Sequence, residues 1–445
     1  MVGNQRNVET TNLNRCWKVI AMDKKKICVM GLGYIGLPTS AMFAAHGCKV
    51  IGVDVNEEII NALNKGEITI EEPYLDIMVQ AAVTSGNLIA DTKPHEADAF
   101  IIAVPTPITK DKKADMSYVV AATEAIVPYL RKGNMVILES TSPPGTVEEL
   151  VVPILQKSGL KIGEELYVGH SPERVLPGKI LWELVHNNRI IGGINRISSE
   201  KICELYRIFV RGEIYLTDVR TAEMCKVVEN TFRDVNIALA NELAKICERM
   251  GIDVWEVIEL ANKHPRVNLH QPGPGVGGHC LAVDPWFIVE KAPDLAKIIE
   301  LSRKTNDGMP QHVLSRIDEI LKDIEGVKRV SILGITYKPN IDDLRESPIV
   351  ELIELMDKRE EYEVRVYDPY VKNHKYRAKD LIEAVDGSDL VVLAVHHDRF
   401  KHLPLDDMAR VMRNRIIFDT RNFLNKEEIE GKGFRYILLG NGANK

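Results

Sequence analysis

A short glycine-rich segment near the N-terminus constrains the fold more than any other feature of this 445-residue chain. The apolar run Ile27–Met30 leads into Gly31-Leu-Gly33-Tyr-Ile-Gly36, and an apolar segment of helical length follows at Leu37–Ala45. Such a segment needs a strand before it and a helix after it, because Gly31 makes a tight turn and Gly36 lets the helix pack on the strand. It therefore predicts the first strand-helix unit of a parallel sheet.

The alternation of apolar strands and helical segments continues to about residue 195. This alternation is typical of a parallel sheet with helices on its faces. Further strands are expected at Lys49–Val53, Ala99–Val104, Met135–Leu138 and Tyr167–Gly169, with Ile190–Gly192 near the edge, and helices at Glu57–Lys65 and Tyr118–Leu130.

The second half of the chain starts with a helical pattern and then returns to strands. Val219–Met250 holds neither Gly nor Pro and predicts one long helix, followed by Val254–Asn262, a Pro/Gly-rich loop and a helical region to about residue 323. From Arg329, the segments RVSILGI, EVRVYDP, SDLVVLAV and RIIFDT predict four buried parallel strands. The predicted fold class is α/β, with two doubly wound Rossmann-like domains (25–212 and 325–445) joined by a central helical, long-helix domain (213–324). Residues 1–24 are expected to form a disordered tail.

Composition excludes several classes of function. Hydrophobic residues make up 45% of the chain and charged residues 27%, and the net charge of -7 gives no basic field for nucleic acid or anionic lipid. No apolar run is long enough to cross a membrane, and the polar N-terminus does not resemble a secretory signal. The seven cysteines are odd in number and hold no CxxC pair, which favours a reducing, cytoplasmic compartment.

The glycine segment predicts a bound dinucleotide. Gly33 lets the backbone approach a pyrophosphate, and the following helix N-terminus favours the anion. Asp54 ends the second strand, where a carboxylate accepts hydrogen bonds from ribose hydroxyls and repels a 2′-phosphate, so NAD is expected over NADP. The alternative is a glycine turn with no ligand. Tyr34 and Ile35 lie within the same loop, and Thr106 and Thr141 lie at strand ends that line the same crevice, although such hydroxyls also serve as local caps.

A second glycine-rich loop, Gly273–Cys280, presents a thiol. Four glycines in eight residues expose backbone amides and suit the presentation of a nucleophile. An inert buried cysteine and a metal site through His279 and Cys280 are the alternatives; no metal is predicted, because adjacent residues rarely share one ion. Lys226 and Asn230 lie four residues apart on one face of the long helix, where a solvated pair is the plain alternative.

Seven motifs together carry a resemblance to a known family. GLGYIGLP, VPTP, ESTSPPGT, SPERVLPG, EMCKVVENTFRDVNIALANE, GPGVGGHCLAVDP and TYKPNIDDLRESP stand in this order over roughly residues 25 to 440. In this combination the chain resembles the UDP-glucose/GDP-mannose dehydrogenase family. The resemblance implies an N-terminal NAD-binding domain, a central dimerisation domain and a C-terminal UDP-binding domain, in a homodimer or larger homo-oligomer.

The resemblance also implies roles for individual residues. Cys280 is the expected nucleophile, Lys226 and Asn230 contact the oxygen that carries negative charge, and Glu173 does acid-base work in thioester hydrolysis. Thr141 and Asp284 position or activate water, and Arg345 contacts NAD across a domain interface. The residues expected to bind substrate besides Lys226 and Asn230 are Arg174, Val175, Leu176, Arg266 (reaching the site of the other subunit), Gly277, Tyr337 and Lys338.

The activity implied by the resemblance is an NAD-dependent four-electron oxidation of the C6 alcohol of a UDP-sugar. SPERVLPG with GGHCLAVDPWFI looks most like members that act on UDP-N-acetyl-D-mannosamine; UDP-N-acetyl-D-glucosamine and UDP-glucose are the alternatives. Arg174 is expected to donate to the acetamido carbonyl, unless it is a plain surface or interface residue. Two other functions are the alternatives. A two-electron Rossmann dehydrogenase shares the first glycine loop but has no use for the Cys280 thiol, and a non-catalytic NAD-sensing protein does not need all of these site residues.

Overall fold

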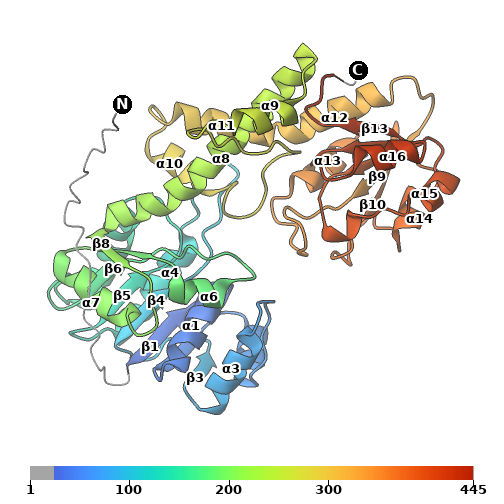
Figure 1. Cartoon of the computed structure of the whole chain (residues 1–445). Helices are drawn as coiled ribbons and strands as arrows, with labels where there is room; N and C mark the ends of the chain where they lie inside the picture. The colour runs from blue at the N-terminus through green and yellow to red at the C-terminus, as the bar shows by residue number, and fades with distance from the viewer. Residues whose placement is uncertain (1–24, 444–445) are drawn as a thin grey trace, which may run out of the picture. The chain divides into compact units, whose positions relative to one another are not determined.

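A computed structural model describes residues 25–443 of the chain, and the tail predicted at residues 1–24 lies outside them. The chain divides into two compact units, Met1–Val228 and Glu229–Lys445. The division falls inside the long helix α8, which spans Val219–Met250 as predicted. Figure 1 shows the helices and strands of both units along the chain.

Unit 1 is built on an eight-stranded sheet with the order β3-β2-β1-β4-β5-β6-β7-β8. Its first six strands follow the 3-2-1-4-5-6 order of dinucleotide-binding sheets, so the doubly wound prediction is confirmed. All neighbouring strands pair in parallel except β6 and β7. The strands are β1 (Lys26–Met30), β2 (Lys49–Val53), β3 (Leu88–Asp91), β4 (Ala99–Ile102), β5 (Met135–Leu138), β6 (Tyr167–His170), β7 (Arg189–Gly193) and β8 (Ile214–Asp218).

Two strands of unit 1 were not predicted from the sequence. β3 is short and lies at one edge, and one of its four residues, Ile89, points to solvent. β8 forms the other edge and is mostly half-buried, so its sequence lacks the continuous apolar run of an inner strand. β7 lies next to this edge strand, as expected for the segment Ile190–Gly192, which was predicted near the edge.

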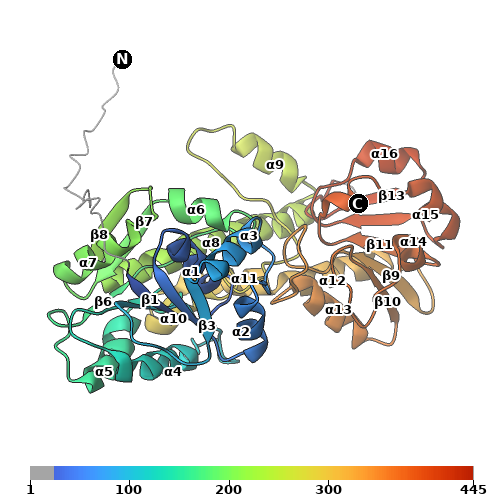
Figure 2. The ribbon, with the colours of Figure 1, turned by 90° about the horizontal axis from the view of Figure 1, so that it is seen from below.

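Helices cover both faces of this sheet. Alternate strand residues divide into two cores, one packed against α1, α3, α6 and α7 and the other against α4 and α5. In Figure 2, α4 and α5 lie on one side of the strands, and α1, α3 and α6 on the other. The helices of unit 1 are α1 (Gly36–Ala45), α2 (Glu57–Asn64), α3 (Leu75–Thr84), α4 (Ser117–Ile126), α5 (Val152–Leu155, after a π-helical turn at Val147–Val151), α6 (Ile180–His186) and α7 (Arg196–Tyr206).

Unit 2 contains a second, five-stranded parallel sheet with the order β10-β9-β11-β12-β13. This 2-1-3-4-5 order is the other common doubly wound arrangement. Four of its strands were predicted, and β13 pairs with β12 at the edge. The strands are β9 (Lys328–Leu333), β10 (Tyr362–Tyr367), β11 (Leu390–Leu393), β12 (Ile416–Asp419) and β13 (Arg435–Leu438).

Helices also cover both faces of the second sheet. α12 and α13 pack on one face, whereas the C-terminal part of α8 packs with α9 on the other. None of the helices within residues 25–443 is long and apolar enough to span a bilayer. The helices of unit 2 beyond α8 are α9 (Val254–Ala261), α10 (Asp284–Lys291), α11 (Lys297–Asp307), α12 (Met309–Ile320), α13 (Pro348–Asp357), α14 (Leu381–Val385), α15 (Leu405–Val411) and α16 (Lys426–Gly431).

The end of the chain is fastened to the helices of unit 2. The backbone nitrogen of Gly440 donates to Glu248 Oε1 at 2.8 Å, and the indole nitrogen of Trp255 donates to the Leu439 carbonyl at 2.8 Å. Asn441 pairs with Asp253 through its side-chain amide at 2.7 Å. Residues 439–441, which follow β13, therefore connect α8 and α9 to the five-stranded sheet.

Candidate functional site

The three glycines of the first loop have different surroundings. A Cβ at Gly31, whose φ is +95°, would lie 2.5 Å from the Ala103 carbonyl oxygen, and one at Gly36 would lie 1.8 Å from the Gly31 oxygen. A Cβ at Gly33 would meet nothing within 4 Å. Packing therefore requires Gly31 and Gly36, whereas Gly33 leaves open backbone that a phosphate can approach.

The carboxylate of Asp54 lies against this loop. Its Oδ2 accepts from the backbone nitrogen of Leu32 at 2.9 Å, and its Oδ1 accepts from the nitrogen of Asn56 at 3.0 Å. Asp54 follows β2 and is half-buried, so its remaining lone pairs can accept from ribose hydroxyls. Thr106 and Thr141, both half-buried, follow β4 and β5 at the same edge of the sheet, and Tyr34 and Ile35 lead into α1. These residues fit a bound dinucleotide.

Glu173 lies in the loop after β6 and is almost completely buried. Its Oε1 accepts from the backbone nitrogen of Arg174 at 2.7 Å, and its Oε2 forms an ion pair with Arg189. Arg189 is the first residue of β7 and was not singled out from the sequence. In the sequence, Arg189 is a charged residue at the start of an otherwise apolar run. A charged residue in that position is also common where a strand begins at the surface, so the sequence did not mark Arg189 as a site residue.

The residues after Glu173 form a loop that is held at several points. The Arg174 guanidinium donates to the Asn188 carbonyl, and the nitrogen of Leu176 donates to Glu183 Oε2 at 2.7 Å. Val175 packs against the core. The buried carboxylate of Glu72 accepts from the nitrogens of Gly178 and Ile180 at 2.7 and 2.8 Å, although nothing in its local sequence marked it for this role.

Lys226 is half-buried on α8, near the end of β6. Burial lowers the pKa of His170, the last residue of β6, to about 3, and the charge of Lys226 adds to this lowering. His170 is therefore neutral, and the Lys226 ammonium is a local positive charge near the loop that carries Glu173.

In unit 2, Cys280 lies one turn before α10. Its carbonyl accepts from the nitrogens of Val283 and Asp284 at 3.1 and 2.8 Å, and the residue is half-exposed. The side-chain amide of Asn230 donates to Asp284 Oδ2 at 2.5 Å, and Arg233 donates to Asn230 Oδ1. Three predicted site residues, Asn230, Cys280 and Asp284, are therefore gathered at the N-terminus of α10, where helix dipoles favour negative charge.

The cysteine loop packs closely on the loop that follows β9. A Cβ at Gly277 would lie 2.4 Å from the Glu346 carbonyl oxygen and 2.8 Å from the Cβ of Tyr337. Gly278, with φ of +84°, donates its N–H to the Arg345 carbonyl at 3.1 Å. Glycine is thus required for this contact, which brings Gly277, Tyr337 and Arg345 together.

The remaining predicted residues of unit 2 differ in their surroundings. The Arg345 guanidinium pairs with Asp343 at 2.6 Å, and the Lys338 carbonyl accepts from the Thr336 hydroxyl at 2.8 Å. Arg266 is exposed in the loop after α9, where its backbone nitrogen donates to His264 at 3.3 Å. Within residues 25–443, no group of three or more His, Cys, Asp and Glu side chains is arranged to hold a metal ion.

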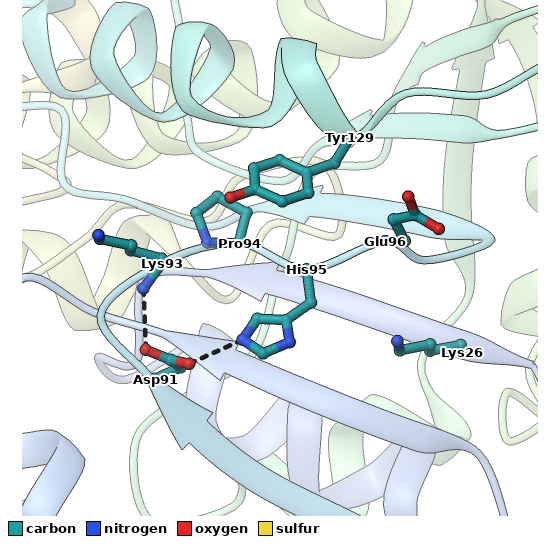
Figure 3. A pocket seen from close by; sticks show the side chains of 7 residues that line it. All are labelled: Lys26, Asp91, Lys93, Pro94, His95, Glu96 and Tyr129. Atoms are coloured by element: carbon teal, nitrogen blue, oxygen red, sulfur yellow. Dashed lines mark hydrogen bonds and ion pairs between the residues drawn. The ribbon is translucent and has the colours of Figure 1, made fainter.

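A surface cavity of about 470 Å³ lies beside the connection between β3 and β4 (Figure 3). The side chains of His95 and Asp91, both half-exposed, form a hydrogen bond of 2.7 Å at this cavity. None of the predicted site residues lines it, so it adds nothing to the candidate site. Its lining residues are Lys26, Asp91, Lys93, Pro94, His95, Glu96 and Tyr129.

Comparison with family models covers most of the chain. Residues 25–210 match the NAD-binding domain of the UDP-glucose/GDP-mannose dehydrogenase family, residues 220–308 its central domain, and residues 331–426 its UDP-binding domain. The expected resemblance is therefore confirmed for the family and for the order of its parts.

Individual relatives agree with the family models. A UDP-N-acetyl-D-mannosamine dehydrogenase of Methanocaldococcus jannaschii is 50% identical over 94% of this chain and 97% of its own length. An NDP-N-acetyl-D-galactosaminuronic acid dehydrogenase of Ralstonia solanacearum is 46% identical over 93% and 99%. The solved UDP-N-acetyl-mannosamine dehydrogenase of Staphylococcus aureus is 49% identical, with a TM-score of 0.87 over 94% of this chain and 99% of that one. The chain belongs to the UDP-glucose/GDP-mannose dehydrogenase family and is an NAD-dependent enzyme that oxidises a UDP-sugar.

Proposed function

We propose that the enzyme oxidises the C6 alcohol of UDP-N-acetyl-D-mannosamine to the carboxylate of UDP-N-acetyl-D-mannosaminuronate, through a thioester on Cys280. The substrate assignment is supported by the near 50% identity, over almost the whole chain, to relatives named UDP-N-acetyl-D-mannosamine dehydrogenase. The observation that supports the covalent route is the half-exposed thiol beside buried Asn230 and Asp284.

The oxidation proceeds in two stages on one bound sugar. NAD supplies the acceptor for the hydride lost at each stage. The alcohol first becomes an aldehyde, to which the Cys280 sulfur adds to give a thiohemiacetal that cannot escape. Loss of the second hydride gives a thioester, and attack by water releases the acid and regenerates the thiol.

Lys226 and Asn230 stabilise the oxygen that becomes negative during these steps. The two residues are one turn apart on α8, and an amide nitrogen carries two N–H groups, so Asn230 can hold Asp284 and still donate to a substrate oxygen. Donors of this kind typically lower a barrier by about 2.7–4 kcal/mol.

Glu173 acts as the acid-base group of thioester hydrolysis, while Thr141 and Asp284 position water. Glu173 is suited to this work because it is buried and held at both oxygens, so its carboxylate has one orientation. Asp284 is likewise held by Asn230.

Substrate recognition uses the loops on which the predicted residues lie. Arg174, Val175 and Leu176 contribute from unit 1, and Arg174 would exchange its bond to the Asn188 carbonyl for one to the acetamido group. The relative of Ralstonia solanacearum, named for an N-acetyl-D-galactosaminuronic acid, supports an N-acetyl sugar of another epimer as the second candidate. The contributing residues of unit 2 are Asn230, Arg266, Gly277, Tyr337 and Lys338.

We assign cofactor binding to the first glycine loop, Asp54, Thr106, Thr141 and Arg345, and the domains to residues 25–212, 213–324 and 325–445. A homodimer is proposed because unit 2 exposes an apolar stripe on α8, where Phe232 is 61% and Met250 65% exposed. Light scattering on a sizing column tests this: Phe232→Asp should give a monomer where the parent gives a dimer. A parent that is monomeric would contradict the dimer.

The proposed reaction is tested with a panel of UDP-N-acetyl-D-mannosamine, UDP-N-acetyl-D-glucosamine and UDP-glucose, each with the parent and with Arg174→Ala. The expected result is two NADH per sugar, fastest with the mannosamine compound, and a selective loss of the N-acetyl sugars in the variant. One NADH per sugar would contradict the thioester route. UDP-glucose turned over as fast as either N-acetyl sugar would contradict the substrate assignment.

A further inference from the structure

A cluster of buried charges lies behind Glu173 in unit 1. The Arg189 guanidinium bridges two carboxylates, with one nitrogen on Glu173 Oε2 and the other 3.4 Å from Glu139 Oε1. The exposed fractions of the three side chains are only 7% for Glu173, 5% for Arg189 and 0% for Glu139. Solvent therefore screens these charges little, and a change in the charge of one carboxylate alters the electrostatic environment of the other.

Glu139 is fixed from several sides. It follows β5, and its Oε1 accepts from the Tyr206 hydroxyl at 2.5 Å while its Oε2 lies 3.4 Å from the Thr39 hydroxyl. The titratable or charged groups that face it are Arg189 from β7, Glu173 from the loop after β6 and Tyr206 from α7; α1 contributes Thr39. The Arg189 guanidinium also lies 4.3 Å from the centre of the Tyr206 ring. Glu139 itself is completely enclosed by protein and has no access to a substrate.

The cluster holds two carboxylates and one guanidinium, so its net charge depends on one proton. Burial raises the pKa of Glu139 to about 7; Arg189 opposes the rise and the Glu173 charge adds to it. When Glu139 is ionised, Arg189 is shared between two anions. When Glu139 is protonated, Arg189 pairs with Glu173 alone and binds it more tightly, which leaves the lone pairs of the Glu173 carboxylate less available to the attacking water.

We propose that Glu139 is a positioning residue that acts on Glu173 through Arg189, so that its protonation state sets the rate of thioester hydrolysis. This inference rests on the proposed role of Glu173. It assigns the pH dependence of product release to a residue that touches neither the sugar nor the reacting atoms.

The experiment follows NADH by stopped flow between pH 6 and pH 8, in the parent and in Glu139→Gln, which mimics the protonated state. The parent should show a fast burst of NADH followed by a steady rate that rises with pH through about pH 7. The variant should keep the burst, and its steady rate should stay near the parent's value at pH 6. A fall of about tenfold at pH 8 is expected, comparable to the loss of a single hydrogen bond to a charged group.

Tyr206→Phe is a second variant that changes the cluster less, and it tests the proposal if Glu139→Gln does not fold. The Tyr206 hydroxyl lowers the pKa of Glu139, so its removal should move the inflection of the steady rate to higher pH. Tyr362→Phe is the matched control, because it also removes a phenol-carboxylate bond of 2.5 Å, to Asp318, but in unit 2 and not in this cluster. Its profile should be that of the parent.

Two outcomes would overturn the inference. One is that Glu139→Gln leaves the parental pH profile unchanged. The other is that the burst and the steady rate fall together in Glu139→Gln and in Tyr206→Phe, as expected of purely structural residues. Glu173→Gln separates the inference from the proposed function. If Glu173→Gln hydrolyses the thioester like the parent, the role of Glu173 is wrong; if it traps the thioester and Glu139→Gln keeps the parental profile, only the present inference fails.

Discussion

The side-chain amide of Asn230 donates a 2.5 Å hydrogen bond to the Oδ2 of Asp284, and both side chains are at least 98% buried. Asp284 begins α10, and its backbone nitrogen donates to the carbonyl of Cys280. The bond therefore connects α8 to the loop that presents the thiol. A change at Asn230 should act both on the reaction and on the geometry of this loop.

We expect Asn230→Ala to lower kcat by about 10²–10³-fold, because an oxyanion donor is lost. The melting temperature should fall as well, since the buried Asp284 carboxylate loses a partner. Steady-state NADH formation and thermal unfolding measure the two effects. Asn236→Ala is the control, because its amide donates only to the Phe232 carbonyl on the same helix among the described bonds. A kcat within about twofold of the parent would exclude a role for Asn230 in the chemistry.

Cys280→Ser should abolish turnover while leaving the binding of NAD and UDP nearly unchanged. Serine keeps the size of the side chain but is a poor nucleophile without a base to activate it. Titration calorimetry and product analysis by mass spectrometry give the two readouts. Cys225→Ser, at the other half-buried cysteine among the described residues, should behave like the parent. Acid formation by Cys280→Ser at a near-normal rate would rule out the thioester.

Two alanine substitutions in the first glycine loop should affect different properties, one the stability of the protein and the other the binding of NAD. Gly36→Ala should destabilise the protein by about 1–3 kcal/mol, because its Cβ would lie 1.8 Å from the Gly31 oxygen. Gly33→Ala should leave the melting temperature almost unchanged, since its Cβ meets no protein atom, but should weaken NAD binding about tenfold or more. If Gly33→Ala binds NAD as tightly as the parent, the pyrophosphate does not lie at this glycine.

Asp54→Ala should reduce the preference for NAD over NADP. The carboxylate that repels a 2′-phosphate is lost, and the Leu32 nitrogen loses its acceptor. The ratio of kcat/KM for the two cofactors is expected to fall by about tenfold or more. Glu57→Ala removes an exposed charge three residues further along and should leave the ratio unchanged. A parent that uses both cofactors equally well would contradict the assignment of Asp54.

The stability of unit 1 should depend on pH through Glu223, which accepts from the nitrogens of Gly145 and Val147 at 2.5 and 2.8 Å. Burial raises its pKa from 4.5 to about 7. Folding thus favours its protonated form, so its contribution to stability is present below about pH 4.5 and is lost as pH rises through 7.

Glu223→Gln removes this dependence. Relative to the parent, its free energy of unfolding should increase by up to about 3 kcal/mol between pH 5 and pH 8. Urea titrations at both pH values measure the difference. Glu200→Gln, which neutralises an exposed glutamate on α7 of the same unit, should show a much smaller change. A difference between Glu223→Gln and the parent that does not vary with pH would contradict the raised pKa.

The sequence was sufficient for the parts of the fold that repeat a local pattern. Continuous apolar runs identified the inner strands, and a long helical pattern without Gly or Pro that ends before Gly251 identified α8. Edge strands were harder, because β3 and β8 bury only one face and resemble loops in composition. Local sequence carries no information about which strand completes an edge.

For the candidate site, the sequence identified the residues that lie in glycine-rich loops or recognised motifs, such as Asp54 and Cys280. It did not identify residues that act through distant partners. Arg189 lies 16 positions from Glu173 and 50 from Glu139, and only the folded sheet brings the three together. The same holds for Glu72, which is 106 positions from the loop that it anchors.

The hydrogen bonds of Leu439 and Gly440 to α9 and α8 have a consequence for folding during synthesis. Glu248 and Gly440 are separated by 192 positions, and Trp255 and Leu439 by 184. During synthesis, α8 and α9 leave the ribosome long before β13 and the residues after it, so their apolar faces lack these partners until residues 435–441 have been made. A chain that stops before residue 439 would therefore lack the bonds that hold α8 and α9, and chaperones and proteases should recognise it.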